Sequence, residues 1–226
     1  MKYQWMLFDA DETLYSFNSY LGLSSMLKRY GIHFTEQDYE EFQAVNKPLW
    51  VAYQNKEISA EELKFTRFAK LSAQTGQCAN VLNHQLMEEM ALVSLPLIGV
   101  ESMLNHLYGK VKMGIITNGF NALQQKRLVN TKTERFFDIV VTSEHVGEAK
   151  PAAKIFDYAF ARMGEFDKSK VLMVGDTLAS DVLGGNQAGV DTCWFNPHRQ
   201  RNETAIRPTY EIHDILQLVD IASGKI

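Results

Sequence analysis

The sequence predicts an α/β fold: a doubly wound parallel sheet with an inserted all-helical segment. Short apolar runs bounded by turn residues recur through the second half of the chain, and helix-like segments separate them. Such alternation is typical of βαβ units with right-handed crossovers. Residues 16–94 contain no strand-like run, and their apolar residues recur at helical spacing. We therefore expect an α/β core formed by residues 1–15 and 95–226, and a helical cap formed by residues 16–94.

The first expected strand is an apolar and aromatic run, residues 3–8, whose composition is typical of a buried parallel strand. In the insertion, the spacings Thr35 to Asp38 and Ser59 to Glu62 are typical of helix N-caps and predict several separate helices. The segment 95–99 contains a proline and a glycine, which mark the return to the core. Further strands are expected at 111–116, 139–142, 171–174 and 192–195, and further helices at 100–107, 122–129, 154–163 and 178–187.

The composition is that of an ordinary protein with a large core, because 46% of the 226 residues are hydrophobic and 22% are charged. The net charge is -4 and no stripe of lysine and arginine occurs, so neither polymeric nucleic acid nor a membrane is an expected partner. Acidic residues interrupt the N-terminus where a secretory signal would be apolar, and a cytoplasmic location is expected. Cys78 and Cys193 lack metal-ligand spacing, and we expect two buried free thiols.

Asp9 and Asp11 place two carboxylates at the end of the first expected strand. Residues two apart near a strand end project to the same side, at the sheet edge where open α/β folds bind ligands. No basic residue accompanies them in this segment, so the pair requires a metal ion, a shared proton or an incoming cation. Taken alone, the segment is equally consistent with a solvated acidic turn.

Polar residues also follow later strands of the expected sheet. Thr117, Asn118 and Gly119 offer a hydroxyl, an amide and backbone N–H groups that suit an anionic oxygen, although such a tripeptide also forms plain turns. Lys150 precedes Pro151, and its ammonium suits a phosphate, whereas a lone lysine is more often a solvated surface charge. Their position after strands favours the phosphate-binding interpretation.

Two more carboxylates follow the strand at 171–174: Asp176 at its end and Asp181 about one turn into the next helix. Helix capping by Thr177 or Asp176 is the alternative role. With Asp9 and Asp11, they place up to four carboxylates at one edge of the sheet. An oxygen-rich site without His or Cys selects a hard cation, and Mg²⁺ is the usual one when the substrate supplies phosphate, with Mn²⁺ or Co²⁺ as substitutes.

In this order, the motifs resemble the four motifs of the haloacid dehalogenase superfamily of phosphatases, and the helical insertion is similar to its helical cap. The segments that carry the resemblance are 9–13, 117–119, 150–151 and 175–181. The resemblance implies that Asp9 is a metal-bound nucleophile that forms an aspartyl-phosphate. It implies that Asp11 is the general acid and base, which contacts the metal through its backbone carbonyl. A dehalogenase is disfavoured, because those enzymes carry a non-acidic residue where Asp11 stands.

The same resemblance implies roles for the other polar residues. Asp176 is implied to be a side-chain metal ligand. Asp181 is implied to support the metal site indirectly, through water or Lys150. Thr117, Asn118 and Lys150 are implied to bind the phosphate.

A closer likeness extends into the insertion. Residues 43–50 and 115–125 are similar to the bacterial pyrimidine 5′-nucleotidases. This implies an enzyme that hydrolyses small nucleoside monophosphates, such as dUMP, dTMP or UMP, to nucleoside and phosphate. A monomer or weak homo-oligomer is expected. Four alternatives stay open: a sugar-phosphate phosphatase, a phosphoglycolate phosphatase, a phosphomutase and a receiver-like signalling module. The insertion argues against the last, which is an uninterrupted domain.

Substrate specificity is expected to come from the cap, which closes over the site and excludes water. Aromatic residues most often fill cores, and polar ones at helix ends are often only solvated. The candidates for recognising the substrate are Asn46, Lys47, Trp50, Tyr15, Phe17, Tyr53 and Arg67.

Overall fold

The computed structural model describes residues 1–226, which divide into two compact units. The α/β unit comprises residues 1–16, 95–119 and 131–226. The helical unit comprises residues 17–94 and 120–130. Residues 120–130 thus belong with the helices, although the sequence placed them in the core segment. The assignment of catalytic and cap roles to these units stays a prediction.

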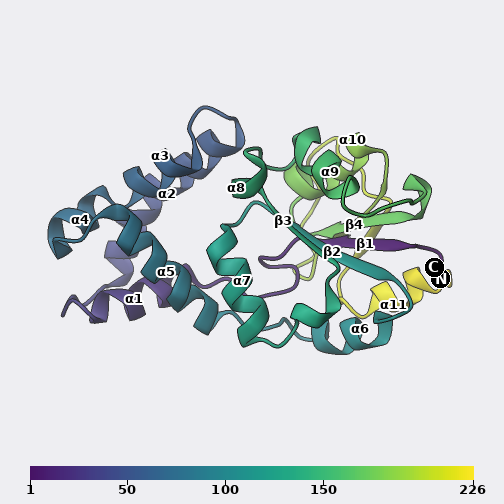
Figure 1. The fold of residues 1–226 in the computed structure, drawn as a ribbon, viewed down its shortest axis with the longest axis horizontal. Coiled ribbons are helices and arrows are strands. Elements are labelled where there is room, and N and C mark those ends of the chain that lie inside the picture. The colour runs from purple at the N-terminus through teal and green to yellow at the C-terminus, as the bar shows by residue number, and fades with distance from the viewer. The chain divides into compact units, whose positions relative to one another are not determined.

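The α/β unit is built on a six-stranded sheet in the order β3-β2-β1-β4-β5-β6, and every pairing is parallel (Figure 1). Helices cover both of its faces, so the expected doubly wound fold is confirmed. The order changes direction at β1, which has the later strands β2 and β4 on its two sides. The strands are β1 (Trp5–Phe8), β2 (Lys112–Thr117), β3 (Ile139–Thr142), β4 (Val171–Gly175), β5 (Asp191–Phe195) and β6 (Tyr210–Ile212).

The helices of the α/β unit lie in two layers: α9 and α10 on one face of the sheet, α6 and α11 on the other (Figure 1). The sequence predicted neither α8 nor α11, nor the edge strand β6. It predicted one helix over 178–187, whereas the structure has a π-helical turn over Leu178–Val182 followed by α10. The helices are α6 (Val100–Leu107), α8 (Ser143–Val146), α9 (Ala153–Phe160), α10 (Leu183–Ala188) and α11 (Gln217–Ala222).

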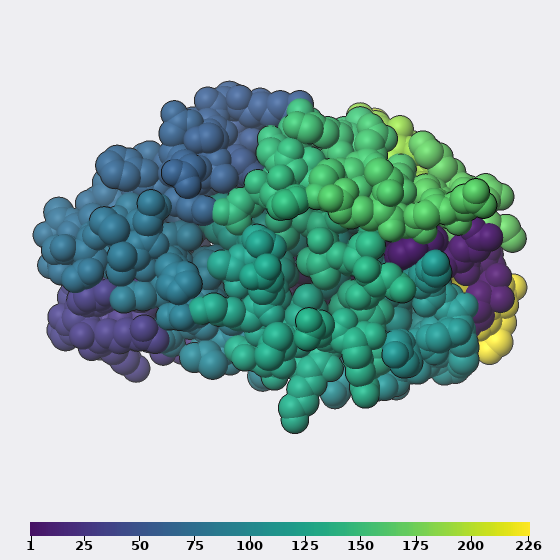
Figure 2. All heavy atoms as spheres, in the orientation of Figure 1, coloured from purple at the N-terminus to yellow at the C-terminus, as the bar shows by residue number.

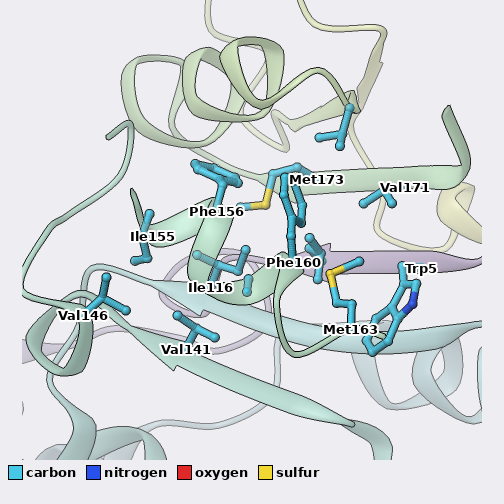
Figure 3. Packing of buried hydrophobic residues seen from close by; sticks show 13 residues of the cluster. Trp5, Ile116, Val141, Val146, Ile155, Phe156, Phe160, Met163, Val171 and Met173 are labelled. Carbon is cyan, nitrogen blue, oxygen red and sulfur yellow. The ribbon is translucent and has the colours of Figure 1, made fainter. Parts of the chain in front are cut away.

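The core between α9 and the sheet is apolar and closely packed. Phe156 and Phe160 of α9 lie against side chains of the strands, including Ile116 and Met173 (Figure 3). Burial of aromatic and aliphatic side chains at this density holds the strand ends in fixed positions. The two termini meet at one end of this unit, where the Lys2 N–H donates to the Ala222 carbonyl at 2.8 Å (Figures 1 and 2).

The helical unit contains six helices, and two of them begin at the predicted caps. Thr35 and Asp38 form a reciprocal capping box at the start of α2, and Ser59 and Glu62 form another at the start of α3. These caps satisfy backbone N–H groups that have no partner within the helix. The helices are α1 (Ser19–Lys28), α2 (Glu36–Gln54), α3 (Ala60–Arg67), α4 (Ala69–Thr75), α5 (Ala79–Val93) and α7 (Asn121–Asn130).

The two cysteines differ in their surroundings. Cys193 is buried in β5 as expected, but Cys78 is exposed, so the prediction of two buried thiols is wrong for the latter. Cys78 is the N-cap residue of α5, and helix ends commonly face solvent. None of the helices combines the length and the apolar character needed to cross a membrane.

Candidate active site

The turn after β1 presents Asp9 and Asp11 at the carboxyl edge of the sheet. The Asp9 N–H donates to the Val174 carbonyl of β4 at 2.8 Å, which extends the strand pairing to the first carboxylate. The chain then turns tightly, because the N–H groups of Leu14 and Tyr15 both donate to the Ala10 carbonyl, at 3.0 and 2.9 Å. This turn keeps Asp11 beside Asp9.

Lys150 lies at the centre of the site, with a side chain that is only 1% exposed. Its Nζ donates to Asp9 Oδ1 at 2.5 Å, to Asp181 Oδ1 at 2.8 Å and to the Ile116 carbonyl at 2.6 Å. An ammonium has three donors, so these acceptors use all of them. Lys150 therefore fixes the positions of two carboxylates that come from opposite ends of the sequence.

The Asn118 side chain holds the backbone of Lys150, a role that sequence reasoning missed. Asn118 Oδ1 accepts from the Lys150 N–H at 2.7 Å, and Asn118 Nδ2 donates to the Lys150 carbonyl at 3.1 Å. Ser143 Oγ in turn donates to the Asn118 carbonyl at 3.0 Å, and Thr117 Oγ1 accepts from the Gly119 N–H at 3.0 Å. The loop after β2 is thus cross-linked to the segment that carries the lysine.

Asp176 and Asp181 follow β4 in a turn that depends on Gly175. A Cβ at Gly175 would lie 2.2 Å from Asp181 Oδ2, closer than a Cβ approaches any non-bonded atom in proteins. Only glycine therefore lets this carboxylate lie against the strand end. Asp181 Oδ2 accepts from the Thr177 N–H at 3.0 Å. The Trp194 indole N–H donates to the Asp176 carbonyl at 2.8 Å. The π-helical turn that carries Asp181 is an arrangement common at functional sites.

Burial and crowding of the carboxylates perturb their protonation. Burial raises the pKa of Asp9 to about 8, and the charges of Asp181, Asp11 and Asp176 add to this rise while Lys150 opposes it. Burial also raises the pKa of Asp176 to about 7, with Asp181 adding to the effect. At Lys150 burial disfavours the charge, but Asp181 and Asp9 outweigh it and raise the pKa. The lysine stays charged, and the excess of negative charge falls on the carboxylates.

The carboxylates have the composition and spacing of a site for a hard cation. One oxygen from each of Asp9, Asp176 and Asp181 lies within 4.8 Å of the others. Oxygen donors without nitrogen or sulfur fit Mg²⁺. The raised pKa values fit it as well, because a bound cation would favour the ionised form of carboxylates that are buried close to one another. The part predicted for the Asp11 carbonyl stays a prediction.

The other sequence candidates are not members of this carboxylate cluster, and all of them except Tyr15 belong to the helical unit. Tyr15 is 0% exposed and its hydroxyl shares a hydrogen bond of 2.6 Å with Thr133, so it fills the core and cannot stack on a base. Tyr53 is also buried, whereas Phe17 and Lys47 are exposed. In the helical unit, Asn46 and Arg67 are buried and Trp50 is half-buried.

Comparison with known proteins identifies the family. The family model of the haloacid dehalogenase-like hydrolases matches residues 3–189. The chain belongs to this family. The hydrolase is 47% identical to the pyrimidine 5′-nucleotidase YjjG of Escherichia coli, over 97% of this chain and 99% of the relative. It is 34% identical to the pyrimidine 5′-nucleotidase PynA of Streptococcus pneumoniae, over 100% and 98% of the two chains.

A solved structure agrees with this membership. The hydrolase superposes with a TM-score of 0.84 on the HAD-hydrolase YfnB of Bacillus subtilis, crystallised with magnesium, at 29% identity over 98% of this chain and 99% of that one. The family and the enzyme class that the sequence motifs predicted are therefore confirmed.

Proposed function

We propose that this hydrolase is a Mg²⁺-dependent 5′-nucleotidase that converts pyrimidine nucleoside monophosphates to nucleoside and phosphate. The near full-length likeness to two pyrimidine 5′-nucleotidases supports the substrate class. The observation that carries the chemistry is the buried Asp9 carboxylate, held by Lys150 beside three further carboxylates. This arrangement joins a nucleophile to a cation site.

The first step transfers the phosphoryl group to Asp9. A carboxylate oxygen of Asp9 attacks phosphorus, the bond from phosphorus to the ester oxygen breaks, and Asp11 gives its proton to the departing oxygen. Lys150 holds Asp9 Oδ1 and so orients the carboxylate for attack. Bound Mg²⁺ would neutralise negative charge on the carboxylates and on the phosphoryl oxygens. Asp9 and Asp176 would hold the ion through their side chains.

The second step regenerates the enzyme. Asp11, now ionised, takes a proton from a water molecule whose oxygen attacks phosphorus. The bond between phosphorus and the Asp9 oxygen breaks, so that inorganic phosphate leaves and the carboxylate is restored. Thr117 and the Asn118 N–H are proposed to bind the phosphoryl oxygens throughout, because they lie at the end of β2, at the same edge of the sheet.

One assay tests this proposal: phosphate release from a substrate panel, with Mg²⁺ or with EDTA. The panel contains UMP, dUMP, dTMP, CMP, AMP, ribose 5-phosphate and phosphoglycolate. We expect the highest kcat/KM with a pyrimidine nucleotide and loss of turnover with EDTA. Equal turnover of all nucleotides and ribose 5-phosphate would contradict the substrate class, and full activity in EDTA would contradict the metal. A clear preference for phosphoglycolate would favour the alternative phosphatase.

A further inference from the structure

Arg67 carries a buried guanidinium that no carboxylate of the protein neutralises. The residue is 6% exposed, and its Nη2 donates to the Oδ1 of Asn83 on α5. Its Nε–H is buried and has no hydrogen-bond partner. Burial alone lowers the pKa of Arg67 to about 9. An unpaired buried donor on a charged group is costly, so proteins seldom keep one unless something else satisfies it.

Asn46, on the neighbouring helix α2, has a buried hydrogen-bond acceptor without a partner. The residue is 8% exposed, and its Nδ2 donates to Gln43 Oε1 at 3.1 Å. Gln43 Nε2 donates to the Tyr39 hydroxyl at 2.6 Å and to Ser19 Oγ at 3.3 Å, which fixes its oxygen toward Asn46. Asn46 Oδ1 is left buried without a partner. The helical unit thus contains a buried free acceptor and a buried free donor.

Both groups belong to the face on which α2 packs against α3. Asn46 lies one helical turn from Phe42 and one from Trp50, and side chains four residues apart share a helix face. The Phe42 ring contacts that of Phe68, with centroids 5.9 Å apart, and Phe68 directly follows Arg67. The free acceptor is therefore on the side of α2 that faces the arginine.

Aromatic rings lie against this region, and one of them, Phe120, is adjacent in sequence to the loop proposed to bind phosphate. The Phe120 ring lies 5.1 Å from the Trp50 ring, 5.1 Å from the Arg67 guanidinium and 5.0 Å from Lys64 Nζ. Phe120 also follows Gly119 directly, so one peptide bond separates the aromatic group from the loop proposed to bind phosphate.

We propose that Arg67 and Asn46 recognise the base of the nucleotide: Arg67 donates to a ring carbonyl oxygen, and Asn46 accepts from the neighbouring ring N3–H. This rests on the proposed function. Uracil and thymine carry an N–H between two carbonyl groups, so they match the pair in either orientation of the ring. Cytosine lacks this N–H and matches in only one orientation, through its amino group. Half-buried Trp50 supplies an aromatic surface on which a base stacks.

The first test needs no mutation. UMP, N3-methyl-UMP and ribose 5-phosphate are compared as substrates of the Mg²⁺-loaded enzyme, since methylation replaces the N–H that would donate to Asn46 with a methyl group. We expect kcat/KM for N3-methyl-UMP to be about 10- to 100-fold below that for UMP, because a buried acceptor is left unpaired. In Asn46→Ala the two nucleotides should be used almost equally. Equal use by the unmodified enzyme would overturn the role of Asn46.

The second test separates recognition by Arg67 from a structural role. Arg67→Met keeps most of the side-chain volume, and we expect it to lower kcat/KM for UMP by about 10- to 100-fold while ribose 5-phosphate turnover is unchanged. Arg29→Met is the matched control, because Arg29 is in the same unit but is 46% exposed in its side chain and paired with Glu89. Equal losses with both substrates in Arg67→Met would overturn the proposal. If the unmodified enzyme does not prefer UMP to ribose 5-phosphate, the proposed function itself fails.

Discussion

Replacing Gly175 by alanine tests whether the position of Asp181 controls the chemistry. Both residues lie in the α/β unit, and the added Cβ would meet the Asp181 carboxylate at 2.2 to 2.4 Å. Ordinary contact begins near 3.4 Å, so the carboxylate must move by about 1 Å. That shift disrupts the 2.8 Å contact with Lys150 and the 3.0 Å hydrogen bond from the Thr177 N–H.

The expected effect is larger on activity than on stability. Overpacking of a single methyl group costs about 1–3 kcal/mol of the free energy of unfolding. Displacement of catalytic groups by about 1 Å lowers the rate about 10²-fold. We therefore expect Gly175→Ala to fold, to melt at a lower temperature, and to release phosphate from UMP about 10²-fold more slowly at saturating substrate.

Gly114→Ala is the matched control, because its Cβ would meet Ile139 Cγ1 at 2.5 Å, within the apolar packing of β2 against β3. The two variants are compared by thermal unfolding and by kcat at a temperature where both are folded. Gly114→Ala should lose stability but keep its kcat. If both variants keep kcat, or if both lose it in proportion to their stability, the position of Asp181 does not control the rate.

Three further predictions concern charges of the site. Asp9→Asn should abolish phosphate release while the circular dichroism spectrum stays unchanged; residual turnover near the original rate would exclude Asp9 as the nucleophile. Lys150→Met leaves Asp9 and Asp181 buried without their cation, so kcat should fall about 10²- to 10³-fold and the free energy of unfolding by about 3–5 kcal/mol, measured with urea. An unchanged urea midpoint would contradict the ion-pair geometry. Mg²⁺ affinity should rise with pH up to about pH 8, because Asp9 and Asp176, with pKa values of about 8 and about 7, must lose protons to bind the ion. A pH-independent affinity in titration calorimetry would count against these ligands.

Much of the fold could be predicted because its longer elements carry a clear period. Strands β1 to β5 are apolar runs between turn residues, and both ends of each strand were predicted to within two residues. The missed elements are too short to show a period: β6 (Tyr210–Ile212) has three residues with a glutamate in the middle, and α8 (Ser143–Val146) has four. The π-helical turn before α10 could not be predicted, because a π-helical turn and an α-helix have the same apolar pattern over five residues.

The convergence of Asp9, Lys150 and Asp181 was predictable for a different reason. Parallel strands place all their carboxyl ends at one edge of the sheet, so residues that follow separate strands meet there. Sequence order does not say which atom contacts which. The Asn118 side chain, predicted only as part of a phosphate loop, therefore proved to be the group that holds Lys150, and the glycine required at 175 was not foreseen.

The balance of charge in the site favours the proposed metal. Lys150 already gives its three donors to Asp9, Asp181 and a carbonyl, so it has none left for Asp176 or Asp11. A divalent cation beside Asp9 and Asp176 would balance three ionised carboxylates together with the lysine, but not a fourth. A cation bound there would favour the ionised form of Asp9, and an ionised carboxylate is what attack on phosphorus requires.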